Sequence, residues 1–394
     1  MSEATPTAED FQPPAALAGV QRAALAVGVL GTLGLIAGFV LQPERFFQSY
    51  LVGWFYWLAI SLGCLGWSMI QHLTGGTWAL VLRRTFEAGT KTLPLLLVLA
   101  LPFLFGMNYI YPWARPEAID DSLIQAKAAY LNVPFFWVRV AICFGIWLAL
   151  TYALNRNSQK QDATGDPKST VAMRMISGPG LVLLVVSGSF TSWDWLMSTD
   201  PHWFSSLYGF WFISSTALAG LCFGTIWAWW LHKRQPMQGV FKTRHFHDYG
   251  KLTLALTMFW AYMTLSQFLI TYSGNVPEFT IWYIHRNDHG WKIFTVLLVI
   301  FHFFVPFLIL LSAKIKQQPG RLVMIAFYML FMRWMDLYWQ AAPNFHKHLT
   351  FHALDLAAIA GVGGLWVWFF IHQLQKHTLL PLNDPFMEEV LGHA

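Results

Sequence analysis

Long apolar runs alternate with short polar segments along most of this chain. A helix needs about 20 apolar residues to cross roughly 30 Å of hydrocarbon, and the runs are close to that length. In lipid every backbone polar group must be paired within the chain, so runs of this length are expected to be helices. We predict ten spans, at residues 22–41, 50–70, 92–111, 133–154, 172–190, 204–231, 250–271, 292–313, 321–341 and 351–373.

The composition agrees with a membrane protein. Hydrophobic residues make up 56% of the 394 residues and charged residues only 11%. A soluble globule of this length needs more polar surface than that. The predicted fold class is therefore all-α, with ten transmembrane helices. Spans 2–5 and 6–9 are each expected to form a four-helix bundle, in repeat halves of about 50–190 and 204–341, and the first and tenth spans are expected to be peripheral.

The distribution of positive charge predicts the orientation. Most of the 25 Lys and Arg residues fall before the first span, in the even-numbered loops or after the last span. Cytoplasmic loops carry such an excess. We therefore expect cytoplasmic tails at 1–21 and 374–394 around a membrane domain at 22–373. The first tail is polar and mildly acidic, unlike a signal peptide. The net charge of +5 follows this bias and does not suggest nucleic acid.

The polar segment Ser192–Trp203 separates two apolar runs on the predicted outer side. It contains Asp194, Asp200 and His202 with three Trp residues and no Lys or Arg. Trp side chains favour membrane interfaces, so we expect a loop at the bilayer surface whose acidic and imidazole groups can titrate. An alternative interpretation is a helix start, with Asp200 as the N-cap and Pro201 in the first turn.

Several ionisable residues fall inside the predicted spans, where a charge costs about 2.5–3.5 kcal/mol on insertion scales. Arg333 and Asp336 are spaced i, i+3 and therefore share a helix face. His352 and Asp355 repeat that spacing where the tenth span begins, and Arg139 lies in the outer third of the fourth. If these helices adjoin, one polar cluster is expected beneath the outer loop. The alternatives are an ion pair that sets helix register and a pair that closes a helix end.

The seventh span carries a polar stripe with helical periodicity, and the eighth carries one central histidine, His302. Hydroxyl and amide groups can relay protons through water, but they also hydrogen-bond neighbouring helices. We therefore expect either a proton path with His302 as its relay or a set of packing contacts. The stripe consists of Thr253, Thr257, Thr264, Gln267 and Thr271.

No metal or cofactor is expected on this chain. Its three cysteines lie inside spans without a Cys-x-x-Cys pair, which argues against iron–sulfur and covalent haem sites. A bis-histidine haem needs two central histidines, and only His302 is central. Two histidine groups on the outer side lack the cysteines common in zinc sites and are more typical of a docking surface. They are His346, His348 and His352, and His285 and His289.

Two motifs resemble a known family. The segment Trp193–Ser205 reads Trp-Asp-Trp-Leu-Met-Ser-x-Asp-Pro-His-Trp-Phe-Ser, and Tyr130–Phe136 reads Tyr-Leu-Asn-Val-Pro-Phe-Phe. With ten helices, they resemble the NrfD-like (polysulfide reductase membrane subunit-like) family, most closely the ActF-type subunits of bacterial alternative complex III. The resemblance covers the spans but not the first or last 20 residues.

The resemblance implies a multi-pass subunit of the bacterial inner membrane, within a quinol:cytochrome c (or other electron acceptor) oxidoreductase. Such a subunit binds no cofactor itself. It anchors an outer-face iron–sulfur subunit and c-type cytochrome subunits, which hold the clusters and haem c, beside a sister NrfD-like subunit. Menaquinol or another quinol from the membrane pool supplies the electrons, and lipids surround the subunit.

One departure from the family bears on the role of this chain. The sister subunit has a Pro-Gly-Trp-His pattern where this chain has Asp200–Trp203. The departure favours a non-catalytic subunit that conducts protons or serves as a scaffold. A quinone pocket around Arg139 with aromatic walls is the alternative within the same complex. A stand-alone secondary transporter and a purely structural anchor are the alternatives outside it; Pro306 interrupts one span, as breaks do in carriers.

Overall fold

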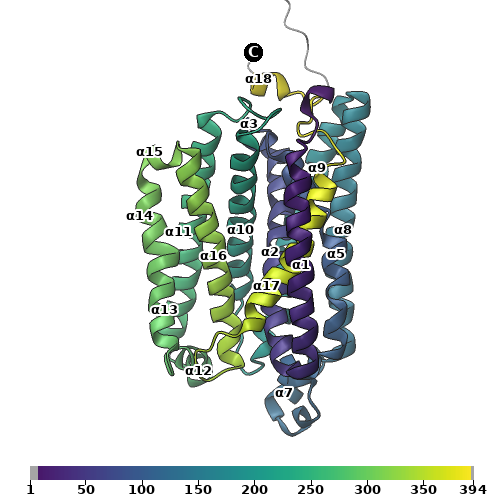
Figure 1. Ribbon diagram of the computed structural model, residues 1–394. Coiled ribbons are helices and arrows are strands. Elements are labelled where there is room, and N and C mark those ends of the chain that lie inside the picture. Colours follow the sequence, from purple (N-terminus) through teal and green to yellow (C-terminus); the bar gives the residue numbers. More distant parts are fainter. Residues whose placement is uncertain (1–7, 392–394) are drawn as a thin grey trace, which may run out of the picture.

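The computed structural model describes residues 8–391, and within that range all regular structure is helical (Figure 1). Ten helical segments of the described chain are long and apolar enough to cross a membrane. The all-α prediction with ten spans is confirmed, and the chain is a polytopic integral membrane protein.

The long helices follow the predicted spans with shifted ends. They are α1 (Ala16–Leu41), α2 (Pro43–Thr74), α4 (Arg83–Thr90) continued by α5 (Leu93–Val98), α8 (Val133–Thr164), α9 (Pro167–Trp195), α10 (Leu207–His232), α11 (Thr243–Gly274), α13 (Trp291–Val299) continued by α14 (Val305–Leu311), α16 (Pro319–Ala341) and α17 (Ala353–Leu374). Short helices in the connections are α3 (Thr77–Leu80), α6 (Met107–Ile110), α7 (Ser122–Ala126), α12 (Pro277–His285), α15 (Ala313–Lys316) and α18 (Met387–Leu391).

The long helices pack as two four-helix sets joined at their centre. The first set contains α2, α4 with α5, α8 and α9, and the second contains α10, α11, α13 with α14, and α16. Helix α2 packs against α10, which joins the sets. Helix α17 packs on α2, and α1 packs on α17 outside both sets (Figure 1). This is the arrangement expected from the order of the spans.

The joint between the sets depends on two glycines. A Cβ atom added at Gly63 of α2 would lie 2.4 Å from the carbonyl oxygen of Thr216, and one at Gly220 of α10 would lie 2.6 Å from the carbonyl carbon of Gly63. Both contacts are to backbone atoms, which cannot move aside as a flexible side chain can. Small residues of this kind let membrane helices approach closely.

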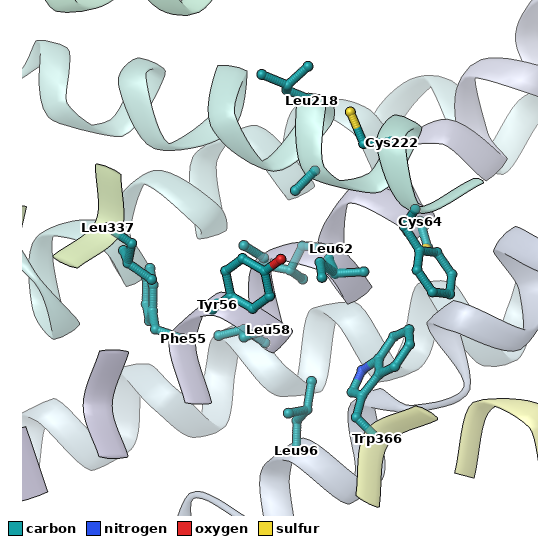
Figure 2. Packing of buried hydrophobic residues seen from close by; sticks show 14 of the residues in the cluster. Phe55, Tyr56, Leu58, Leu62, Cys64, Leu96, Leu218, Cys222, Leu337 and Trp366 are labelled. Atoms are coloured by element: carbon teal, nitrogen blue, oxygen red, sulfur yellow. The ribbon is translucent and has the colours of Figure 1, made fainter. Parts of the chain in front are cut away.

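Helix α2 is the centre of the apolar core. Figure 2 shows Leu62 of α2 among side chains from neighbouring helices, including Leu218 of α10, Leu337 of α16 and Trp366 of α17. The Trp366 indole N–H donates to the Ser61 hydroxyl over 2.8 Å. The contacts of α2 therefore connect both sets with α17.

The third span differs from its prediction. It begins at Arg83, nine residues before the predicted start at 92, and ends at Phe105. Arg83, Arg84 and Glu87, which fall in the predicted loop between the second and third spans, lie buried in α4. An average of hydropathy over a window of residues misses this start, because Arg83, Arg84 and Glu87 lower the average even though their charges are paired. The span is also divided into short helices at prolines, since proline provides no N–H for a helical hydrogen bond.

The connections between the long helices lie at two opposite ends of the bundle, which we call the terminal face and the opposite face. The terminal face holds both ends of the described chain with α3, α15 and α18, and the opposite face holds α7 and α12 (Figure 1). The Leu379 N–H donates to the Phe11 carbonyl over 2.9 Å, so the two chain ends are in contact. The basic loops lie on the terminal face, and its location in the cytoplasm stays a prediction.

Candidate functional site

Asp336 lies at the centre of the second set. It is on α16 with no exposed surface and forms an ion pair with Arg333, one turn earlier. Its Oδ2 atom also accepts hydrogen bonds from the Trp260 indole N–H at 3.2 Å and the Gln340 amide at 3.0 Å. The other oxygen, Oδ1, is buried without a partner. The carboxylate is therefore neutralised on one side and free to bind a proton or water on the other.

His302 lies beside this carboxylate site. It is fully buried, and its ring centroid is 3.9 Å from that of Trp260. Neither ring nitrogen has a hydrogen-bond partner. The residue belongs to a π-helical turn at Ile300–Phe304 between α13 and α14. Pro306 explains the turn, because it has no N–H to donate to the His302 carbonyl four residues earlier. Such turns are frequent at functional sites.

Polar groups connect Asp336 with the opposite face. The backbone oxygen of Gln340 accepts from Nη2 of Arg286 at 2.7 Å, and the same nitrogen donates to Oδ1 of Asn344 at 3.0 Å. The Asn344 amide donates in turn to the Thr199 hydroxyl at 2.7 Å. The series begins at the buried carboxylate and ends at two residues, Asn344 and Thr199, that line a surface hollow.

This hollow on the opposite face has a volume of about 510 Å³. Its lining collects Asp and His side chains from three connections, and all of them except Asp288 were singled out from the sequence. The group consists of Asp200, His202, His285, Asp288, His289 and His346. Within residues 8–391, no group of three or more His, Cys, Asp or Glu side chains is placed to hold a metal ion. The hollow thus gathers acidic and imidazole side chains on the opposite face.

Asp200 does not begin the next helix. Helix α10 begins at Leu207, and the Asp200 carboxylate accepts instead from the backbone N–H of His202 at 3.3 Å. The His202 ring lies 2.7 Å from Oδ2 of Asp121. This hydrogen bond holds the pKa of Asp121 below its usual value. The N-cap interpretation is therefore wrong, because six residues separate Asp200 from Leu207 and Ser206 occupies the N-cap position of α10.

The stripe on α11 is formed mainly by hydroxyls bonded to their own helix. The hydroxyls of Thr253 and Thr257 donate to the carbonyls four residues earlier, each at 2.8 Å. Both side chains are buried, and each oxygen can still accept one hydrogen bond. At the terminal end of the stripe, Nε2 of His245 is buried and unpaired. Thr264 and Thr271 bond their own carbonyls in the same way.

Gln267 belongs to a different contact. Its side-chain oxygen accepts from the Ser205 hydroxyl at 2.5 Å, next to the start of α10. The predicted stripe therefore consists of two parts in the structure. Thr253 and Thr257 lie on the terminal side of Trp260, whereas Gln267 hydrogen-bonds the connection between α9 and α10.

Asp194 and Arg139 form a separate cluster in the first set. Asp194 is buried in the last turn of α9, which extends to Trp195. Its oxygens accept from Nε of Arg139 at 2.8 Å and from the Tyr130 hydroxyl at 2.9 Å. The segment that we predicted to be a surface loop is thus helical at its start, and Trp195 and Trp203 are buried rather than interfacial.

His352 and Asp355 close the beginning of α17. The His352 N–H donates to Asp355 at 2.8 Å, while the His352 ring accepts from the N–H of Leu354 at 3.2 Å. Asp355 also accepts from Arg45 at 2.7 Å and Ser49 at 2.5 Å. The helix-end interpretation describes this pair. The prediction of one shared polar cluster is wrong, because the carboxylates of α9, α16 and α17 each pair with a different arginine.

Sequence reasoning missed a further cluster beneath the terminal face. Arg83 has no exposed surface and binds Glu87 at 3.0 Å and Asp384 at 2.8 Å. Its Nη2 atom donates to Ser158 at 2.9 Å and Gln161 at 3.0 Å. The available signal was the i, i+4 spacing of Arg83 and Glu87, which places both on one helix face.

Comparisons with known proteins add no family to this description. No model of a known protein family matches the chain, and no curated protein matches it. What the structure itself defines is a ten-helix integral membrane protein whose interior holds several paired charges.

A fall in pH should lower the stability of the folded protein, in part through His346. Burial and the adjacent Arg45 lower the pKa of His346 to about 4, while Asp355 opposes the shift. The unfolded chain binds this proton near pH 6.5, so stability should be lost as the pH falls from 6.5 towards 4. We expect His346→Gln to reduce the drop in thermal unfolding temperature between pH 7 and pH 5 in detergent. The exposed His348→Gln is the control, and an unchanged drop in His346→Gln would contradict the assignment.

Proposed function

We propose that this chain is a membrane subunit of a bacterial quinol:electron acceptor oxidoreductase and that it conducts protons through its second four-helix set. The resemblance of Trp193–Ser205 and Tyr130–Phe136 supports the type of complex. The observation that carries the proton path is Asp336, a fully buried carboxylate with one unpaired oxygen, a connection to the opposite face and an unpaired imidazole beside it.

The proposed path has two halves that meet at Asp336. On the opposite side, water between Gln340, Asn344 and Thr199 carries protons to the hollow that contains Asp200 and His202. Hydroxyl groups and imidazoles both accept and donate hydrogen bonds, as a relay requires.

On the terminal side, His302 is the relay between Asp336 and the hydroxyls of Thr257 and Thr253. His245, buried at the start of α11, is the entrance. Arg333 is the buried counter-charge of Asp336, because an unpaired charge in the membrane is costly.

The hydrogen bonding of each carboxylate distinguishes the Asp336 site from the other charged clusters. Asp194 and Asp355 have both oxygens hydrogen-bonded by arginine, tyrosine, serine or backbone donors. Asp336 alone of these three leaves one oxygen unpaired. We therefore assign Asp194, Arg139, His352 and Asp355 to holding helix ends together.

The redox chemistry of the proposed complex belongs to its other subunits. An iron–sulfur subunit and c-type cytochrome subunits would dock on the opposite face, which would be the outer side of the bacterial inner membrane. The sister NrfD-like subunit would lie beside this chain and oxidise menaquinol or another quinol. A role for this chain as a quinol site around Arg139 has less support, since Asp194 pairs with that guanidinium and the Tyr130 carbonyl accepts from its Nη1 atom, which leaves only Nη2 unpaired.

A secondary transporter is the alternative with a specific observation behind it. Carriers bind substrate at helices broken near the midplane, and the π-helical turn divides α13 from α14. The corresponding helix of the first set, α8, is continuous over Val133–Thr164. The third span is also divided, but its counterpart α11 is continuous, so the breaks do not fall at corresponding positions of the two sets. This mismatch favours the proton path over alternating access.

Purification from membranes tests the proposed complex. A mild detergent, an affinity tag at the C-terminus, mass spectrometry, an optical spectrum and an iron assay are sufficient. We expect c-type haem, iron–sulfur iron and a second ten-helix subunit to copurify in a fixed ratio. If the chain emerges alone and colourless under conditions that keep other membrane complexes intact, the assignment to an oxidoreductase fails and transport assays should replace it.

A further inference from the structure

A groove of about 470 Å³ lies between α1, α2, α17 and residues 99–105, which follow α5. Its rim includes Phe39 and Phe105, which are 46% and 78% exposed, so the groove opens towards lipid. Among the described residues that line it, Thr32 and Tyr50 alone have polar side chains. Both hydroxyls donate to backbone carbonyls, each at 2.7 Å. The groove therefore offers no free side-chain donor and suits a hydrocarbon chain.

A hollow of about 520 Å³ lies on the opposite face where α2 begins, and we call it the α2 hollow. Gln48 lines it and is only 4% exposed. Its Nε2 atom donates to Glu44 over 3.3 Å, but its Oε1 atom is buried without a partner. The Nε atom of Arg45, which lines the same hollow, is also buried and unpaired. Buried polar atoms of this kind favour a ligand that pairs with them.

The charges in the α2 hollow favour a ligand with a cationic group. The Nη1 atom of Arg45 contacts His346, and Nη2 donates to Asp355 over 2.7 Å. Burial and Arg45 lower the pKa of His346 to about 4, so this imidazole is neutral near pH 7. Asp355 offsets the charge of Arg45, and the exposed Glu44 adds a negative charge. A purely anionic head would therefore meet a carboxylate in this hollow.

Three aromatic rings connect the α2 hollow with the groove. Tyr109 of α6 lines the hollow, and Phe39 of α1 lines the groove. The Phe47 ring contacts both, stacked on Tyr109 at a centroid distance of 5.4 Å and edge-on to Phe39 at 5.9 Å. Tyr109 and Phe39 are 38% and 46% exposed. A hydrocarbon chain that begins in the hollow can therefore cross these rings and continue into the groove.

We propose that the α2 hollow and the groove together bind one phosphatidylethanolamine molecule from the bilayer. Its ammonium group would donate to Oε1 of Gln48 beside the Glu44 carboxylate, and a phosphate oxygen would accept from Nε of Arg45. One acyl chain would cross the three rings into the groove. A choline head has the same charge but no N–H to donate, and a glycerol head has no positive charge. The site depends on neither the proposed proton path nor the proposed redox partners.

Photolabelling with matched lipid probes tests the site. The purified protein, with any subunits that copurify, is placed in phosphatidylcholine nanodiscs that contain a trace of a lipid with a diazirine in one acyl chain. Three probes differ only in their ethanolamine, choline or glycerol head, and peptide mass spectrometry locates the label. The ethanolamine probe should label residues 32–39 and 99–105 about tenfold more than the other two, the effect of one hydrogen bond to a charged group.

Gln48→Leu tests the contact with the headgroup. Leu has a similar size and lacks the unpaired oxygen, so the variant should fold and lose the preference for the ethanolamine probe. The matched control is Gln71→Leu. Gln71 also lies on α2, is 3% exposed and has a buried, unpaired Oε1 atom, but it is near the terminal end of the helix. This variant should keep the tenfold preference.

Glu44→Gln is a second test that does not alter a buried side chain, and it should reduce the preference for the ethanolamine probe. Equal labelling of the wild type by the ethanolamine and choline probes would overturn the proposal. Stronger labelling by the glycerol probe would replace it with an anionic lipid. An undiminished preference in Gln48→Leu, or the same loss in Gln48→Leu and Gln71→Leu, would exclude Gln48 as the contact with the headgroup and would equally overturn the site.

Discussion

Replacing Asp336 with Asn should sharply lower the number of protons moved per electron while leaving the complex assembled. Asn keeps the size and the contacts with Trp260 and Gln340 but cannot take up a proton. The purified complex in proteoliposomes, driven by a soluble quinol and followed with a pH-sensitive dye, gives the ratio. Electron transfer, measured in parallel, should continue because the redox centres belong to other subunits in the proposed complex.

Two further variants make the Asp336 experiment decisive. Asp336→Asn leaves the buried Arg333 without its counter-charge, a change that can cost about 3–5 kcal/mol. The double variant Arg333→Gln with Asp336→Asn removes both charges and should also assemble, with the same loss of proton movement. Asp194→Asn, in the first set, should leave the ratio unchanged. An assembled double variant with the wild-type ratio would exclude Asp336 from the path.

The parts of the fold that were predictable are those that depend on local sequence. Ten apolar runs gave ten helices because a span must pair its own backbone groups. The pairing of Arg333 with Asp336 was also predictable, since their i, i+3 spacing lies within one helix. The break between α13 and α14 was predictable from Pro306 for the same reason. Proline has no N–H, so one hydrogen bond to the preceding helical turn is missing.

The contacts between helices were not predictable from one sequence. Arg139 and Asp194 are 55 residues apart, and Arg45 and Asp355 are 310 apart. The sequence shows where these charged residues lie along the chain, but it does not show which of them pair with one another. This is why one polar cluster was expected where the structure has several.

The start of the third span shows a different kind of failure. Arg83 and Glu87 were placed in a loop because charged residues lower the hydropathy of a window. In the structure their charges compensate each other, and a third partner, Asp384, comes from a segment 301 residues away. A hydropathy scale assigns each residue a cost as if it were alone, so a buried network is read as solvent-exposed chain.

Replacing Arg83 with Met should destabilise the protein more than any surface change. The variant keeps an unbranched apolar chain but leaves Glu87 and Asp384 buried with one cation fewer. It also removes the donors to Ser158 and Gln161. Breaking a buried pair on one side costs about 3–5 kcal/mol, because the remaining charge stays desolvated. Thermal unfolding in detergent, followed by the fluorescence of a thiol-reactive dye at the buried cysteines, measures the loss.

The matched control for Arg83→Met is Arg156→Met on α8, where the guanidinium is exposed and only approaches the Tyr152 ring. That variant should unfold within a degree or two of the wild type, as exposed charges contribute little. Asp384→Asn should give a smaller loss than Arg83→Met, because Arg83 keeps Glu87. If Arg83→Met and Arg156→Met unfold at the same temperature, the terminal-face cluster does not hold the first set together. A large loss in Arg83→Met but not in Arg156→Met would support a buried charge network that joins α4 to the segment around Asp384.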